Sequence, residues 1–69
     1  MEYKYRAGIN GGVYRKATGE LAEAYNFKTG EWKVTDAARE AFYTGEDTFV
    51  ISPEDVQVEI GRQKERFGI

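Results

Sequence analysis

Residues 3–35 read YKYRAGINGGVYRKATGELAEAYNFKTGEWKVT. The stretch contains three turn signals, each a glycine preceded by Asn or Thr: Asn10-Gly11, Thr18-Gly19 and Thr29-Gly30. Glycine suits such turns because it adopts backbone conformations that other residues avoid. The segments between the turns are rich in Tyr, Val, Phe and Trp, which favour β-strands. The stretch therefore predicts an antiparallel meander of four short strands.

The strand register determines which side chains share a face of this sheet, because successive residues of a strand point to opposite sides. A two-residue type I′ turn at Asn10-Gly11 would place Ala7 opposite Tyr14. Even-length loops at the two Thr-Gly turns then gather nine large apolar side chains on one face, the aromatic face. These are Tyr3, Tyr5, Ile9, Tyr14, Leu21, Tyr25, Phe27, Trp32 and Val34. Glu23 is a charged misfit on this face, and we expect it near an edge.

The two Thr-Gly turns allow a second register. Thr-Gly often closes a three-residue loop with a glycine bulge, which reverses the sides to which the following strand points. That register would set Tyr14 beside Ala22 and Trp32 beside Asn26. We expect four-residue loops instead, because burial of the aromatic side chains outweighs the turn preference. Trp32 is then buried between Tyr25 and a covering helix.

The opposite side of the meander, the predicted outer face, is mildly basic. Its cations are Lys4, Arg6, Arg15, Lys28 and Lys33, and they stand against only Glu20 and Glu31. Charge is also uneven along the chain. Residues 1–34 carry six Lys/Arg and four Asp/Glu, a net +2, whereas residues 35–69 carry four and eight, a net −4, and the sum is the −2 of the whole chain. The five cations are the candidate binding residues.

The second half of the chain predicts a short helix and a fifth strand. Thr35 or Asp36 can cap an alanine-rich helix over about 36–43, and Gly45 is placed to end it. The run TFVI at 48–51 is short and β-branched, so it predicts a strand.

The segment SPED at 52–55 is typical of a helix start, with serine as N-cap, proline in the first turn and two acids near the positive end of the helix dipole. A helix over about 53–67 would carry Val56, Ile60 and Phe67 as its apolar stripe. The run VQVEI at 56–60 also alternates between apolar and polar residues, so a terminal hairpin is the alternative. We favour the helix because the capping signals agree with the basic charge near its C-terminal end, where Gly68 follows as a stop.

Residues 1–69 together predict a single small α+β domain. It is a four- to five-stranded antiparallel meander sheet over about 3–35 and 48–51, with one short helix and a C-terminal helix packed on the aromatic face. The core is small, because a chain of this length buries about 60% of the surface that it exposes when unfolded. Ten aromatic residues offset this, since each ring can bury roughly 150 to 250 Å².

Composition and motifs exclude several kinds of chemistry. The chain has no cysteine and no histidine, which removes disulfides, thiolate metal sites and the commonest general base. Residues 8–11, GING, have the G-x-x-G spacing of some RNA-binding loops, but they join two predicted strands and indicate a hairpin turn. We therefore expect no enzyme activity, no metal and no cofactor. With no apolar run near the roughly 18 residues of a membrane span and no apolar leader, we expect a cytoplasmic protein.

These features favour a small non-enzymatic binding module that acts through protein–protein contacts, as accessory, adaptor or inhibitor proteins do. The alternative is a nucleic-acid-binding domain that uses the basic outer face of the sheet. A protein partner is expected in the first case, and a homodimer is compatible with either.

Overall fold

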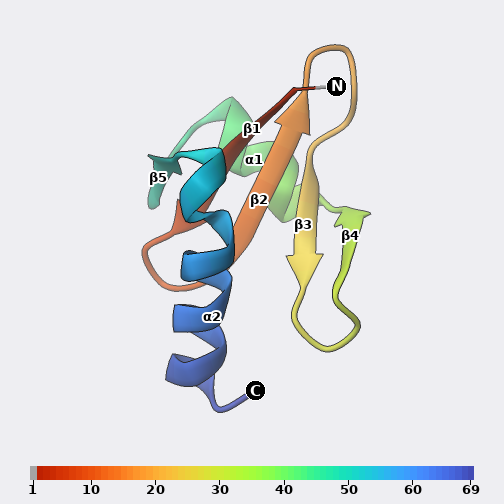
Figure 1. The fold of residues 1–69 in the computed structure, drawn as a ribbon. Coiled ribbons are helices and arrows are strands. Elements are labelled where there is room, and N and C mark those ends of the chain that lie inside the picture. Colours follow the sequence, from red (N-terminus) through yellow and green to blue (C-terminus); the bar gives the residue numbers. More distant parts are fainter. Residues whose placement is uncertain (1) are drawn as a thin grey trace.

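The computed structural model describes residues 2–69, which form a five-stranded antiparallel sheet with one helix on each side (Figure 1). Along the chain the elements are β1 (Tyr3–Gly8), β2 (Val13–Ala17), β3 (Glu23–Asn26), β4 (Glu31–Val34), α1 (Asp36–Tyr43), β5 (Thr48–Ile51), the single 3-10 turn η1 (Pro53–Asp55) and α2 (Val56–Phe67). The strand order is β4-β3-β2-β1-β5, so β5 extends the meander at the edge of β1. The predicted α+β class is confirmed.

The two helices cover opposite faces of the sheet. In Figure 1, α2 lies in front of the sheet and α1 behind it. The buried core joins Val13 of β2 to Val56 and Ile60 of α2, and Tyr5, Tyr25, Phe27, Trp32 and Ile51 pack around it. The C-terminal helix therefore covers the aromatic face, as predicted. We call the other side the α1 face.

The first hairpin differs from its prediction by one residue. Ala7 pairs with Val13 rather than Tyr14. The loop is wider than a two-residue turn: the Gly8 N–H donates to the Gly12 carbonyl at 3.0 Å, which leaves three residues between them. Gly11 and Gly12 both adopt positive φ in this loop, at 118° and 100°. The slip turns β2 over, so Val13 reaches the core and Tyr14 points to the α1 face.

The prediction for the second turn is also wrong, and its error offsets the effect of the first on the strands that follow. Tyr14 pairs with Ala24, so the four-residue loop predicted at Thr18-Gly19 is wrong, and Tyr14 shares its side with Ala24 as in the bulge register. The chain turns tightly, with Glu20 N–H donating to the Ala17 carbonyl at 3.0 Å, and it pairs again only at β3. Because the two slips cancel, β3 and β4 still present their aromatic side chains on the predicted side.

The third turn is as predicted. Tyr25 pairs with Trp32 and Asn26 with Glu31, which leaves a four-residue loop. Gly30 closes it with a φ of 77°, and its N–H donates to the Asn26 carbonyl at 2.8 Å. Trp32 packs at 5.2 Å from the Tyr25 ring but is only half-buried, so the expectation that α2 encloses it fully is wrong.

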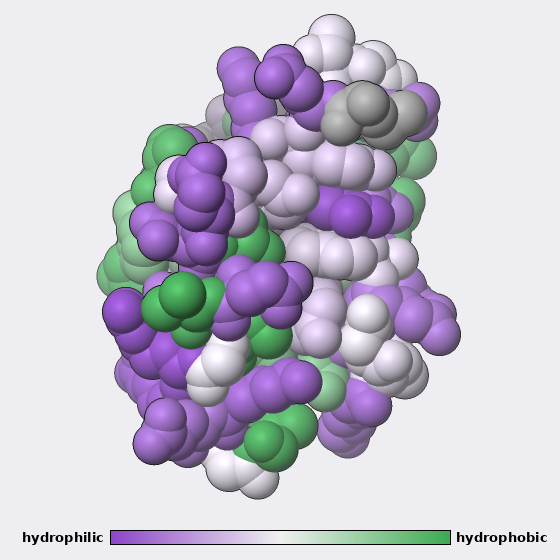
Figure 2. Space-filling model, in the orientation of Figure 1, coloured by the Kyte–Doolittle hydropathy of each residue, from purple (hydrophilic) through white to green (hydrophobic). Residues whose placement is uncertain are grey.

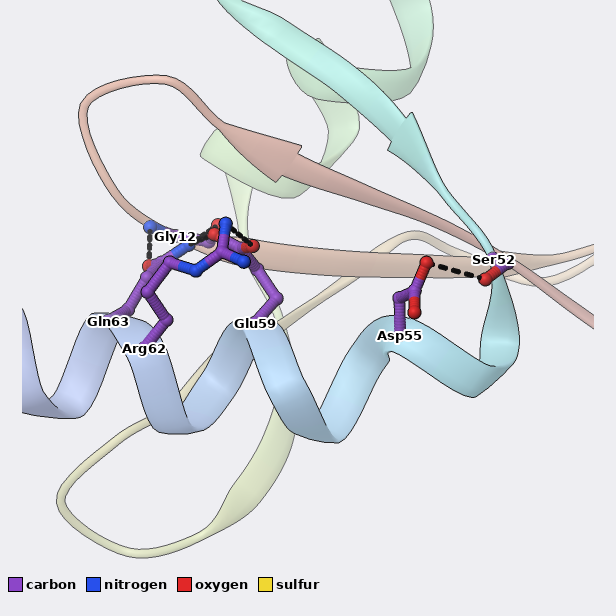
Figure 3. A network of polar contacts seen from close by, with 6 residues as sticks. All are labelled: Gly12, Ser52, Asp55, Glu59, Arg62 and Gln63. Atoms are coloured by element: carbon purple, nitrogen blue, oxygen red, sulfur yellow. Dashed lines mark hydrogen bonds and ion pairs between the residues drawn. The ribbon is translucent and has the colours of Figure 1, made fainter.

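Residues 53–67 are helical, so the terminal hairpin is excluded. The Ser52 hydroxyl donates to the Asp55 carboxylate at 3.0 Å instead of accepting a backbone N–H, so the serine does not cap the helix through its side chain (Figure 3). Gly68 ends α2 with a φ of 70°. Phe67 is 46% exposed, which removes it from the predicted buried stripe.

Polar side chains take part in docking α2 on the sheet. The Gln63 side-chain amide pairs with the backbone of Gly12: the Gly12 N–H donates to Gln63 Oε1 at 2.6 Å, and Gln63 Nε2 donates to the Gly12 carbonyl at 3.0 Å (Figure 3). Gln63 Nε2 also donates to Glu59 Oε1 at 3.1 Å, and Arg62 pairs with Glu59 Oε2 at 3.3 Å. Buried polar groups need such partners, and here they connect α2 to the first hairpin loop.

None of the helices in residues 2–69 has the length and apolar character that crossing a membrane requires.

Candidate functional site

The five predicted binding cations do not form one surface. Arg15 lies on the aromatic face, because the slip of the first hairpin turned β2 over. Its guanidinium lies 4.2 Å from the centroid of the Tyr3 ring and 4.5 Å from that of Trp32. Arg15 Nε also pairs with Glu23 Oε1 at 2.9 Å. The misfit Glu23 thus has a partner on its own face, which explains how the sheet tolerates a carboxylate there.

The other four predicted cations are also dispersed. Lys28 belongs to the loop between β3 and β4. Lys33 and Lys4 lie on the α1 face, separated by two strands. Arg6 lies on the same face, but its Nε donates to the Thr48 hydroxyl at 2.8 Å and its Nη2 to the Thr48 carbonyl at 3.4 Å. Arg6 therefore connects β1 to β5.

An extended concavity lies on the α1 face, and α1 forms one of its walls. It is an open groove of about 820 Å³ between α1, the start of β1, the end of β2, and the loop from β2 to β3. Its charged lining residues are Glu2, Lys4, Lys16, Glu20, Asp36 and Arg39, and its large apolar ones are Leu21, Val34, Phe42 and Tyr43. A volume of this size is within the range of about 300 to 1,000 Å³ that is usual for ligand sites.

The position of α1 follows from its sequence. The Thr35 hydroxyl accepts the N–H of Ala38 at 3.0 Å and caps the helix, as predicted for this residue. Ala38 and Ala41 are buried, at 0% and 5% exposure. Small side chains at these positions let α1 lie close to the sheet, whereas Phe42 and Tyr43, one and two residues further on, reach the groove.

Three large apolar side chains of the groove are exposed. Tyr43 is 85% exposed, Leu21 70% and Val34 57%. Leu21 also borders a smaller cavity of about 290 Å³ on the other side of the loop, together with Tyr3 and Glu23. Single exposed apolar residues are ordinary on protein surfaces, but several around one groove mark an interaction site.

The cations of the groove have no carboxylate partner. Lys4 and Lys16 are directly opposite each other on β1 and β2. The Lys16 ammonium donates to the Ala17 carbonyl at 3.4 Å. Within residues 2–69, neither lysine nor Arg39 of α1 forms an ion pair, and the two pairs present are Arg15–Glu23 and Arg62–Glu59.

The aromatic face offers a second, weaker candidate surface. α2 leaves the β3 and β4 side of this face uncovered, and Figure 2 shows it as a largely pale region beside the mixed purple and green surface of α2. The rings of Tyr5 and Tyr25 lie 6.2 Å and 5.2 Å from Trp32 in tilted or edge contacts. Arg15 lies against both the Tyr3 and the Trp32 rings, so the space between these two rings is already occupied.

Sequence reasoning missed most of the groove. Lys4 was among the predicted residues, but Lys16, Arg39, Leu21 and Tyr43 were not. Lys16 could have been found from the strand register, because a shift of β2 by one residue relative to β1 places Lys16 opposite Lys4. Nothing local could place Arg39 there, because its position depends on how α1 packs against the sheet.

Comparison of the chain with protein-family models, with curated proteins and with solved structures finds no match.

Proposed function

We propose that this protein is a small non-enzymatic binding module that receives a segment of another protein in the groove beside α1. The observation that carries the proposal is the open groove of about 820 Å³ bordered by two strongly exposed apolar side chains, Leu21 and Tyr43. Apolar and aromatic anchors of this kind supply most of the binding energy at protein interfaces, whereas the polar rim excludes water and sets orientation.

The groove is better suited to a protein segment than to the backbone of a nucleic acid. Three carboxylates, Glu2, Glu20 and Asp36, line it beside the three cations. A nucleic-acid backbone carries a negative charge at every nucleotide and is bound by surfaces with a large surplus of positive charge, whereas the lining of this groove has as many carboxylates as cations. The wider basic surface expected for nucleic acid also loses Arg15 to the aromatic face and Arg6 to its bonds with Thr48.

The test captures partners from a lysate of the native host on three immobilised forms of the protein. The first is the wild type, the second carries Leu21→Ser and Tyr43→Ser, and the third carries Val58→Ser, an exposed apolar residue of α2 away from the groove. Any captured protein is then purified, and its affinity for each form is measured. All three forms should fold, because the substituted side chains are exposed.

We expect a partner whose affinity falls at least about tenfold for the groove variant and is unchanged for the α2 control, since a tenfold change corresponds to about 1.4 kcal/mol. A partner that binds all three forms equally, or no partner above background, contradicts the proposal. Retention of the wild type on heparin that salt abolishes, with no protein captured, would instead support a nucleic-acid ligand.

A further inference from the structure

We infer that the segment received by the groove is acidic, with carboxylates placed beside an apolar anchor residue. This inference rests on the proposed function and adds the chemistry of the partner. It is drawn from three cations without an ion pair among the described residues, from the placement of two of them opposite each other on adjacent strands, and from the partial burial of Lys16.

The first observation is the cross-strand pair of lysines. Lys4 and Lys16 are Cα partners on adjacent strands, and both project to the α1 face. Like charges directly opposite each other destabilise a sheet, because their side chains are neighbours on one face. Neither lysine has a carboxylate within ion-pair distance in the described part of the chain. A bound carboxylate between them would turn this repulsion into attraction.

The second observation is that one charged residue of the groove, Lys16, is more buried than the other five. The groove is lined by three cations and three carboxylates, so their number alone favours neither sign. Lys16 is half-buried, whereas Lys4, Arg39 and the three carboxylates are exposed. Water screens exposed charges more strongly, so the half-buried Lys16 contributes more to the local field than each of the exposed residues.

Asp36 is further compensated by its place in the fold. It lies in the first turn of α1, where the N-terminal end of the helix dipole favours a negative charge. Arg39, one turn later on the same helix, lines the groove without an ion pair. Over residues 2–69 the three carboxylates of the groove also lack ion pairs, so the positive charge is a local feature: Lys4 and Lys16 are opposite each other on the sheet, and Arg39 adds a third cation from the helix.

The third observation is that large apolar side chains line the same groove as these cations. Leu21 and Tyr43 are exposed at the groove, and Phe42 is half-buried in its lining. A segment that bears one large apolar side chain flanked by Asp or Glu would satisfy both the apolar surface and the lysines. A segment with Lys or Arg at the flanking positions would meet the lysine pair and be repelled.

The experiment selects peptides from a random twelve-residue library on the immobilised wild-type protein. Peptides that also bind the Leu21→Ser, Tyr43→Ser variant are removed. Those that remain depend on the groove. We expect their sequences to be enriched in Asp and Glu next to Leu, Phe or Trp, relative to the unselected library.

The affinities of the selected peptides are then measured for two lysine variants. Lys4→Gln with Lys16→Gln should weaken binding about tenfold and flatten its dependence on salt. Lys28→Gln with Lys33→Gln, which removes two lysines that do not line the groove, should leave binding unchanged. The unliganded Lys4, Lys16 variant should unfold at the same or a higher urea concentration than the wild type, because it loses a repulsive pair. This combination of weaker binding with undiminished stability separates a loss of recognition from a loss of fold.

The possible failures are distinguishable. Groove-dependent peptides without acidic enrichment, or with affinities that the Lys4, Lys16 variant leaves intact, would overturn the inference while the proposed function stands. A selection that yields no groove-dependent peptide would contradict the proposed function and the inference together.

Discussion

Arg15 makes contacts of two kinds on the aromatic face. Its guanidinium stacks against the rings of Tyr3 and Trp32 and forms an ion pair with Glu23. It was expected on the opposite side of the sheet, and the structure shows why its new place is favourable: the stem of an arginine can pack among rings while the head keeps a polar partner.

Replacement of Arg15 should therefore cost more than loss of an exposed charge. We expect Arg15→Ala to lower the free energy of unfolding by about 1 to 2 kcal/mol, because it removes two cation–π contacts and an ion pair. Glu23→Gln is the matched control and should cost less than about 1 kcal/mol, since it removes the ion pair alone and both side chains are partly exposed. Urea unfolding followed by Trp32 fluorescence measures both. Equal losses in the two variants would show that the ring contacts contribute nothing.

At the scale of elements, the helices were predictable because their signals are local. Thr35 caps α1, Gly45 follows its end with a φ of 70°, and Gly68 stops α2 in the same conformation. The register of β2 was not predictable, because Ile9 N–H bonds to the Asp47 carbonyl at 2.9 Å, far along the chain, and so extends the pairing of β1 with β5 past Gly8. Long-range pairing of this kind competes with the local preference of Asn10-Gly11 for a two-residue turn.

The groove was beyond sequence reasoning for a similar reason. The sequence pattern identified Lys4 as a surface cation, but its lysine neighbour follows from the register of β2, and the opposite wall follows from the docking of α1. A single-residue error in one hairpin moved Arg15 away from the predicted set and left Lys16 out of it. Surface predictions from strand patterns are therefore only as good as the register of each turn.

The contact between α2 and the first hairpin should depend on Gln63. We expect Gln63→Ala to lower the free energy of unfolding by about 1 to 3 kcal/mol, because it leaves the Gly12 N–H without its partner and removes one of the two donors to the Gly12 carbonyl, which keeps the Gly8 N–H. Gln57→Ala, at an exposed position of the same helix, should change it by less than about 0.5 kcal/mol. Urea unfolding of the two variants gives both values. A Gln63→Ala variant as stable as Gln57→Ala would mean that water replaces the side chain at Gly12 without cost.

At the scale of the whole molecule, the stability depends on a thin core. Val13, Val56 and Ile60 are its buried centre, and half-buried aromatic rings surround them. The expected free energy of unfolding for 69 residues is on the order of 3 to 10 kcal/mol. Because α2 supplies two of the three central residues, the helix and the sheet should unfold in a single transition rather than one after the other.

Ile60→Ala tests this cooperativity. Removal of a side chain that is 3% exposed should cost about 2 to 5 kcal/mol and lower the melting temperature by at least about 8 °C, since each kcal/mol shifts a domain of this size by about 4 to 8 °C. Val58→Ala is the matched control on the exposed side of α2. It changes helix propensity in a similar way but leaves no cavity in the core, so it should shift the melting temperature by only a few degrees at most. The measurement follows helix content by circular dichroism and the aromatic face by Trp32 fluorescence in the same thermal scan. We expect the two signals to change at one temperature in every variant, because neither the sheet nor α2 retains a core without the other. Loss of the helical signal at a clearly lower temperature than the fluorescence change would show that the sheet stays folded after α2 has unfolded.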